Sequence, residues 1–304
     1  MGGQTRSGEM ALAGAAVAPG QGERKRSGAS VWRRFARNPL AVAAFVILIA
    51  LILVVLVGPL VIPASQVTAQ VRSATFAPPS ADAPFGRDEF GRDAFVRAIY
   101  GGRTSLWVAF IATVINTLIG VLLGMVGGYA GGWIDAIIDR FVELILTLPF
   151  LLLLILAAAV LQPSATSIIV ILGLFGWPVL ARIVRGEFVS LKGREFIEAA
   201  RASGASAPRI VVRHMLPNAM APIIVTATLT LATNLIAEAT ISYLGLGIKP
   251  PLPSWGNMLT EAQNYLIKAP YLAIFPGMLI LITVLCVNLL GDGLRDALDP
   301  RLKR

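Results

Sequence analysis

Apolar residues in this chain fall into long continuous runs that are separated by shorter polar stretches. A helix of about 20 apolar residues can cross the ~30 Å hydrocarbon layer of a membrane. Helices satisfy their own backbone hydrogen bonds, so they are the expected form of such runs in lipid. The pattern predicts an all-α integral membrane protein with six transmembrane helices, at about residues 40–62, 104–128, 141–161, 164–183, 218–244 and 271–290.

The first 30 residues are rich in Gly, Ala, Ser and Gln and lack apolar periodicity, which predicts a disordered cytoplasmic tail for residues 1–30. Arg33 and Arg34 precede the first apolar run, as arginines do in a twin-arginine signal peptide. That run is longer than a signal-peptide core of about 7–15 residues, so we interpret it as a retained transmembrane helix. Residues 31–304 are predicted to form one six-helix domain, with residues 184–217 as its main cytoplasmic loop.

Composition agrees with a membrane protein, because 56% of the 304 residues are hydrophobic and 14% are charged, against about 25% charged in an average soluble domain. Nucleic-acid-binding proteins also carry positive charge, and this chain has a net charge of +9. However, its Lys and Arg residues cluster beside the apolar runs, as the positive-inside rule predicts. We therefore expect a multi-pass protein of the bacterial plasma (inner) membrane with both termini in the cytoplasm and no nucleic-acid partner.

Reactive residue types are scarce. Cys286 is the only cysteine and His214 the only histidine, so the chain offers no disulfide framework and no cysteine- or histidine-cluster metal site. No Gly-x-x-x-x-Gly-Lys-Ser/Thr phosphate loop occurs. The sequence predicts no catalytic residues, no metal site and no cofactor in this chain, and hence a protein that is not an enzyme.

The loop at residues 184–217 is the longest basic, polar interruption between two apolar runs. Its residue types predict a first short helix at about Glu195–Ser203, ended by Gly204 in the left-handed conformation. Ser206 is predicted to cap a second helix. Pro217 is predicted to end that helix, since the residue before a proline is disfavoured in the α conformation.

One motif in this loop has fixed spacing. Glu198-Ala199-Ala200 is followed after three residues by Gly204, and Leu216-Pro217 follows after a further stretch. This spacing resembles the EAA loop of ABC importer permeases. The family more often has an aliphatic residue where His214 stands here.

The resemblance implies the fold of a type I ABC importer permease, in which this loop is a coupling helix that docks on a cytoplasmic ATPase. It implies that the residues at the ATPase contact are Glu198, Ala199, Ala200 and Gly204, with Arg201 at the rim and Leu216 and Pro217 completing the motif. The alternative is an amphipathic juxtamembrane helix of no special function.

Further segments resemble the dipeptide, oligopeptide and nickel branch of these permeases, of the DppC/OppC type. They include a tandem similarity, Gly86–Phe90 and Gly91–Phe95, and the stretches at residues 34–40, 100–106, 242–247, 250–259 and 288–300. The resemblance implies import of a dipeptide, an oligopeptide, nickel or a related small solute. The implied partners are a paralogous permease subunit in a heterodimer, two ATP-binding subunits that hold ATP and Mg²⁺, and an extracytoplasmic substrate-binding protein.

Glu238 is the acidic residue placed deepest in a predicted span. A charge there is costly, so the side chain should face the bundle interior or water. It either makes a structural hydrogen bond between helices or serves a proton relay. The second alternative would make the chain a stand-alone proton-coupled secondary transporter.

Other residues predict packing details. Small residues at Gly120, Gly124, Gly128 and Gly132 recur every four positions and predict close helix contact. Pro149 predicts a kink in the third span. Trp255, Tyr265 and the aromatic residues of the tandem segment are predicted to lie at the membrane interface.

Overall fold

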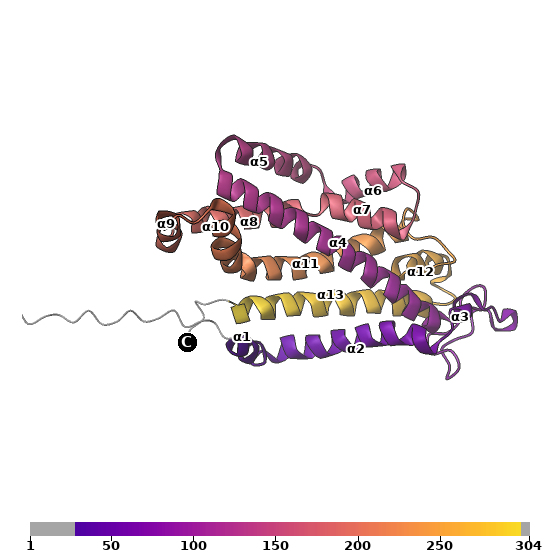
Figure 1. Ribbon diagram of the computed structural model, residues 1–304. Helices are drawn as coiled ribbons and strands as arrows, with labels where there is room; N and C mark the ends of the chain where they lie inside the picture. The colour runs from indigo at the N-terminus through magenta and orange to yellow at the C-terminus, as the bar shows by residue number, and fades with distance from the viewer. Residues whose placement is uncertain (1–27, 299–304) are drawn as a thin grey trace, which may run out of the picture.

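The computed structural model describes residues 28–298, and these residues form a bundle of helices without a β-strand (Figure 1). The long elements are α2 Pro39–Val61, α4 Ala94–Ala130, α5 Gly132–Thr147, α6 Phe150–Val160, α7 Ala165–Phe175, α8 Pro178–Lys192, α11 Leu216–Tyr243 and α13 Tyr271–Leu298. Short elements join them: α1 Gly28–Phe35, α3 Ser65–Thr68, η1 Arg72–Ala74, α9 Glu195–Ala202, α10 Ala207–Ile210, η2 Val211–Met215, α12 Trp255–Ala262 and η3 Gln263–Tyr265. The predicted tail lies outside the described residues, apart from its last three.

Five elements are long and apolar enough to cross a membrane, and the bent pair α5 and α6 makes a sixth if it counts as one span. This confirms the predicted all-α membrane fold. The two ends of the bundle differ. The α9 end also carries α1 and the last turn of α13, whereas the α12 end carries α3 (Figure 1).

Helix α4 begins ten residues before the predicted start of its span. Its first turn is capped by Asp93, whose carboxylate accepts the backbone N–H groups of Phe95 at 2.8 Å and Val96 at 3.3 Å. With 37 residues, α4 is about 55 Å long and exceeds the ~30 Å hydrocarbon layer. It therefore projects from the membrane and carries residues of the polar segment into the bundle.

The third span is broken, not merely kinked at Pro149. Helices α5 and α6 meet at an angle of 88°. Leu148 is extended, with φ −82° and ψ +136°, because the ring of a following proline disfavours the α conformation. The predicted span at residues 141–161 thus becomes two helices, of which the first already begins at Gly132.

The fourth span is longer than predicted. Helix α7 is followed by α8 after a break at Gly176 and Trp177. Helix α8 continues to Lys192, well past the predicted end at residue 183. The polar loop therefore begins near Gly193 and not at residue 184.

Close contact between α4 and α8 uses the predicted small residues. A Cβ on Gly120, Gly124 or Gly128 would lie 3.0 Å or less from an atom of α8; for Gly124 that atom is the Ala181 carbonyl oxygen, at 2.6 Å. Neighbouring backbones in lipid approach through such positions. Gly132 does not belong to this contact, since it starts α5 with φ +59° and has nothing within 4 Å.

Candidate functional site

The first helix of the polar loop forms as predicted. Helix α9 spans Glu195–Ala202, and Gly204 follows it with φ +79°. The N–H of Ala205 donates to the carbonyl oxygen of Ala200 at 3.1 Å, which is the bond that closes a helix on a left-handed residue. A Cβ at Gly204 would meet nothing within 4 Å, so the backbone conformation and not lack of space favours glycine there.

The second helix does not end at Pro217, contrary to the sequence prediction. Helix α10 passes through the π-helical turn η2 directly into α11, and Pro217 stands in the first turn of α11. The N–H of Leu216 donates to the carbonyl oxygen of Val211. The wider π turn lies directly before Pro217, whose ring is incompatible with a regular α-helical turn at that position. Ser206 precedes α10, but its side chain makes no capping hydrogen bond.

Only one side chain of α9 is buried, and it was not among the predicted site residues. Ile197 is fully buried and packs in a cluster with Phe188 of α8, Ile210 of α10 and Met215 of η2. The signal in the sequence was the apolar pair Phe196-Ile197 between Glu195 and Glu198. Burial of one aliphatic side chain stabilises such a contact by about 1.5–3 kcal/mol.

The predicted motif residues divide between two environments. Five of them are exposed: Glu198, Ala199, Arg201, Gly204 and Pro217. Ala200 and Leu216 are partly buried and pack against the cluster around Ile197. The loop therefore presents a polar face with small residues to solvent while its apolar face is fixed to three helices. The exposed surface also includes Phe196, which is 41% exposed and was not singled out from the sequence.

Two contacts join α8 to the last turn of α4 and the first turn of α5. The guanidinium of Arg185 donates to both carboxylate oxygens of Asp135, at 2.5 and 2.6 Å. The ammonium of Lys192 donates to the Tyr129 carbonyl oxygen at 2.8 Å. A bidentate arginine–carboxylate pair fixes orientation as well as distance, so this pair holds α8 and α5 together.

At the opposite end, the tandem segment forms two equivalent turns. Gly86 and Gly91 both have φ +75°. Two residues after each glycine, an aspartate accepts a backbone N–H: Asp88 from Phe90 at 2.9 Å, and Asp93 from Phe95 at 2.8 Å. The repeat in the sequence is thus a repeat of one local conformation, needed because only glycine adopts this φ without strain.

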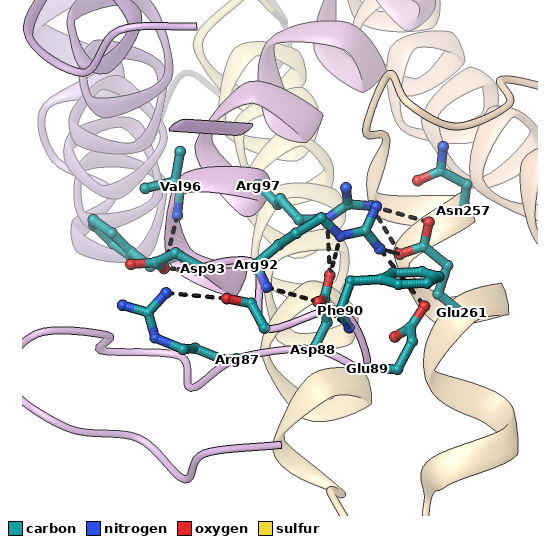
Figure 2. Close-up of polar contacts among 12 residues, drawn as sticks. Arg87, Asp88, Glu89, Phe90, Arg92, Asp93, Val96, Arg97, Asn257 and Glu261 are labelled. Carbon is teal, nitrogen blue, oxygen red and sulfur yellow. Dashed lines mark hydrogen bonds and ion pairs between the residues drawn. The ribbon is translucent and has the colours of Figure 1, made fainter. Parts of the chain in front are cut away.

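The first of these turns enters a buried ion-pair network with α4 and α12 (Figure 2). Arg97, which is 1% exposed, donates to both oxygens of Glu261, at 3.0 and 2.8 Å. Arg92 donates to Asp88 at 2.5 Å and to Glu261 at 3.1 Å. Asp88, Glu89 and Glu261 lie close enough together to share one cation, and in this structure the two guanidinium groups face them.

Burial raises the pKa of the Glu89 carboxyl above its ordinary value, and the neighbouring carboxylates add to this effect. The aromatic residues that were predicted to lie at the membrane interface have different environments in the fold. Phe90 is 49% exposed. Phe95 instead packs edge-to-face against Phe85, with ring centroids 5.0 Å apart. Trp255 is fully buried and donates its indole N–H to the Ala98 carbonyl oxygen at 2.9 Å.

Glu238 lies fully buried where α11 faces α4 and α12. Its Oε1 accepts the hydroxyl proton of Ser242 at 2.9 Å. Within residues 28–298, Oε2 has no hydrogen-bond partner. The bond to Ser242 lies within α11, so it does not join two helices as the sequence led us to expect.

A second buried polar cluster joins α4, α7 and α11 and was not identified from the sequence. Asn234 donates to the Thr113 hydroxyl at 2.9 Å. With the amide of Asn116 oriented by its hydrogen bonds, its nitrogen donates to the carbonyl oxygens of Leu172 and Gly173, both at 2.9 Å. Polar side chains that bond across helices are a common source of packing specificity in lipid.

Two family models match this chain. Residues 116–304 match the family described as the binding-protein-dependent transport system inner membrane component. Residues 28–79 match the N-terminal transmembrane domain of oligopeptide transport permease C.

Curated relatives match over most of their length. The dipeptide transport system permease protein DppC of Alkalihalophilus pseudofirmus is 40% identical over 90% of this chain and 91% of its own length. DppC of Bacillus subtilis is 43% identical over 90% of this chain and 85% of its own. The oligopeptide transport system permease protein OppC of Bacillus subtilis is 39% identical over 90% and 91%.

Solved structures share the fold at lower identity. An inward-facing structure of the MetNI methionine ABC transporter aligns with a TM-score of 0.53 and 22% identity, over 63% of this chain and 91% of that one. An amino acid ABC transporter aligns with a TM-score of 0.52 and 18% identity, over 66% and 92%. None of these comparisons favours the alternative of a stand-alone secondary transporter.

Proposed function

This chain belongs to the family of binding-protein-dependent transport system inner membrane components, and from that premise we propose that it carries peptides into the cytoplasm. It is a membrane-spanning translocation subunit of an ABC importer, embedded in the inner membrane. The peptide cargo is proposed because relatives at 39–43% identity are named for dipeptide and oligopeptide transport. Selection among peptides is proposed to depend largely on a separate substrate-binding protein.

Energy is proposed to come from two cytoplasmic ATP-binding subunits, which hold ATP and Mg²⁺, while this chain holds no cofactor. The observation that carries this is α9, whose exposed face contains Glu198 and Ala199 and whose opposite face is fixed through Ile197. Small side chains beside one charge allow another protein to approach the backbone closely. We infer that the ATPase contact consists of Glu198, Ala199, Ala200 and Gly204, with Arg201 at its rim.

Coupling follows from the way α9 is attached. Ile197 packs on α8, α10 and η2, and α10 continues without a break into α11. When ATP draws the two partner ATPases together, the movement of α9 is therefore passed to two membrane-crossing elements. Ligand-driven population shift between inward-open and outward-open states is the proposed cycle.

A paralogous permease is proposed as the second half of the pathway. Support comes from α5 and α6 of the broken third span, which leave large apolar side chains uncovered by other elements within residues 28–298. Leu144, Leu152 and Leu156 are 64%, 56% and 67% exposed. The proposed orientation places the α9 end and both termini in the cytoplasm, since the basic loop and the basic N-terminal segment lie at that end.

The test is purification of the chain from cells that co-express the neighbouring coding regions. We expect an ATPase to copurify, and Glu198→Arg to release it by charge reversal at the contact. Asp296→Arg is the matched control, because Asp296 is exposed at the same end of the molecule but on α13. Retention of the ATPase by Glu198→Arg, or its release by both variants alike, counts against this docking surface.

A further inference from the structure

A groove of about 800 Å³ runs between α2, α4, α11 and α13. That volume lies within the range of ligand pockets, about 300–1,000 Å³. Aliphatic and aromatic side chains form nearly all of its lining. Leu56 and Trp107 are 56% and 60% exposed, so the groove is open at the outer surface of the bundle, where a membrane-embedded protein meets lipid.

Four of the residues that line the groove are polar, and the side chains of three of them already donate hydrogen bonds within the chain. The Tyr100 hydroxyl donates to the Ile62 carbonyl oxygen at 2.6 Å. The hydroxyls of Thr104 and Thr283 donate to carbonyl oxygens one turn earlier in their own helices. Arg103 is the exception: it is exposed, and residues 28–298 give its side chain neither a hydrogen bond nor an ion pair.

Arg103 stands at the mouth of the groove, at the α12 end. Leu252 and Pro253, which precede α12, line the groove there. On α2, the lining reaches Leu48, which lies 13 residues before Val61 at the α12 end of that helix, or about 20 Å. One leaflet of the hydrocarbon layer is about 15 Å deep, so the groove extends from the α12 end to beyond the midplane.

The lining argues against a helix of another protein as the occupant. Where helices of this chain meet closely, they do so through glycine, as at Gly120, Gly124 and Gly128 of α4. The groove has one alanine and no glycine among its lining residues, and large side chains keep a second backbone away. A flexible chain can fill the space between such side chains.

We propose that this groove binds an acyl chain of an anionic phospholipid from the leaflet at the α12 end, with the lipid phosphate against Arg103. The guanidinium fork matches two phosphate oxygens, and the apolar walls match the chain below it. A free phosphate would gain nothing from those walls. The lipid thus joins α2 to the α4, α11 and α13 bundle.

The binding test uses the copurified complex, stripped of native lipid in detergent and titrated with dipalmitoyl-phosphatidylglycerol in native mass spectrometry. Loss of one charge-assisted hydrogen bond in Arg103→Gln should weaken binding about tenfold. Arg72→Gln is the matched control, because Arg72 is exposed in η1 outside the groove. Equal binding by wild type and Arg103→Gln overturns the proposal.

Two further measurements separate the possible occupants. Leu56→Trp fills the groove without changing charge and should also weaken binding, whereas glycerol phosphate without acyl chains should not compete. Unchanged binding by Leu56→Trp, or full competition by glycerol phosphate, overturns the groove as the site. A photo-reactive benzoylphenylalanine at Trp107 should form adducts with lipid, and adducts with a protein subunit instead would assign the groove to an interface.

Discussion

Gly204 has a left-handed backbone conformation and also belongs to the proposed ATPase contact. Its φ of +79° is costly for any residue with a Cβ. The exposed motif residues Glu198, Ala199 and Arg201 lie just before it on α9. A change at this one residue therefore alters the end of α9 without entering the packed cluster beneath it.

Gly204→Asp is predicted to abolish most ATP-driven peptide uptake while the chain still inserts into the membrane. The side chain places a negative charge at the proposed ATPase contact and adds at most about 1–2 kcal/mol of backbone strain. Gly193→Asp is the control, since Gly193 has φ −95° and equal free space around it. Uptake by reconstituted complexes is the measurement, and wild-type uptake by Gly204→Asp contradicts the assignment.

A separate prediction concerns Glu238. Because the Glu238 carboxylate accepts a hydrogen bond from Ser242 and a glutamine side chain retains an acceptor oxygen, Glu238→Gln should leave the uptake rate and its pH dependence unchanged. Glu238→Leu leaves the Ser242 hydroxyl without that acceptor and should destabilise the protein by about 1–3 kcal/mol. A proton-coupled role predicts the reverse for Glu238→Gln, namely loss of the pH dependence.

Among elements, the ion-pair network decides how the tandem turn, α4 and α12 fit together. Arg97 and Glu261 are 164 residues apart in sequence, yet their contact sets the position of α12 relative to the start of α4 (Figure 2). Buried pairs are costly to break, because removal of one partner leaves an uncompensated charge.

Arg97→Met is predicted to destabilise the protein by about 3–5 kcal/mol. The methionine keeps an apolar stem, but Glu261 and Asp88 lose one of their two arginine partners. Arg140→Met is the control: its pair with Glu143 has side-chain exposures of 84% and 48% and should contribute at most about 1 kcal/mol. Thermal unfolding in detergent measures both. Equal apparent Tm for the two variants contradicts a structural role for the network.

On the scale of the whole molecule, the α9 end and the α12 end are connected by continuous helices. Helix α11, extended by α10 and η2, links α9 to Glu238 and the short helix α12. Helix α4 links the tandem turn to the turn held by Asp135 and Arg185. In the proposed cycle, these continuous helices are the elements that would carry a movement of α9 to the α12 end.

Uptake should require the complete complex. Vesicles that contain this chain without ATPase subunits should show no peptide uptake under an imposed proton gradient, and vesicles with the full complex should take up peptide only when ATP is supplied to the ATPases. Orthovanadate inhibition of the second preparation is the control for ATP dependence. Gradient-driven uptake by the chain alone contradicts the importer mechanism.

Features that depend on near neighbours along the chain were predictable from the amino-acid pattern. Apolar run lengths predicted the spans, and Gly204 predicted the end of α9, because hydrophobic length and φ preference are local properties. Local rules failed where context changes them. Pro217 starts α11 instead of ending a helix, and a π turn lies directly before it.

Only the tertiary structure decided which distant polar residues meet. Arg97 with Glu261, Asn116 with Leu172, and Arg185 with Asp135 each join different helices. Apolar membrane helices have no periodic polar pattern that would reveal such partners, since both lipid-facing and packed surfaces are apolar. Lipid solvates every apolar helix face equally well. Which helices pack together therefore depends on shape complementarity and on polar groups that find hydrogen-bond partners within the folded bundle.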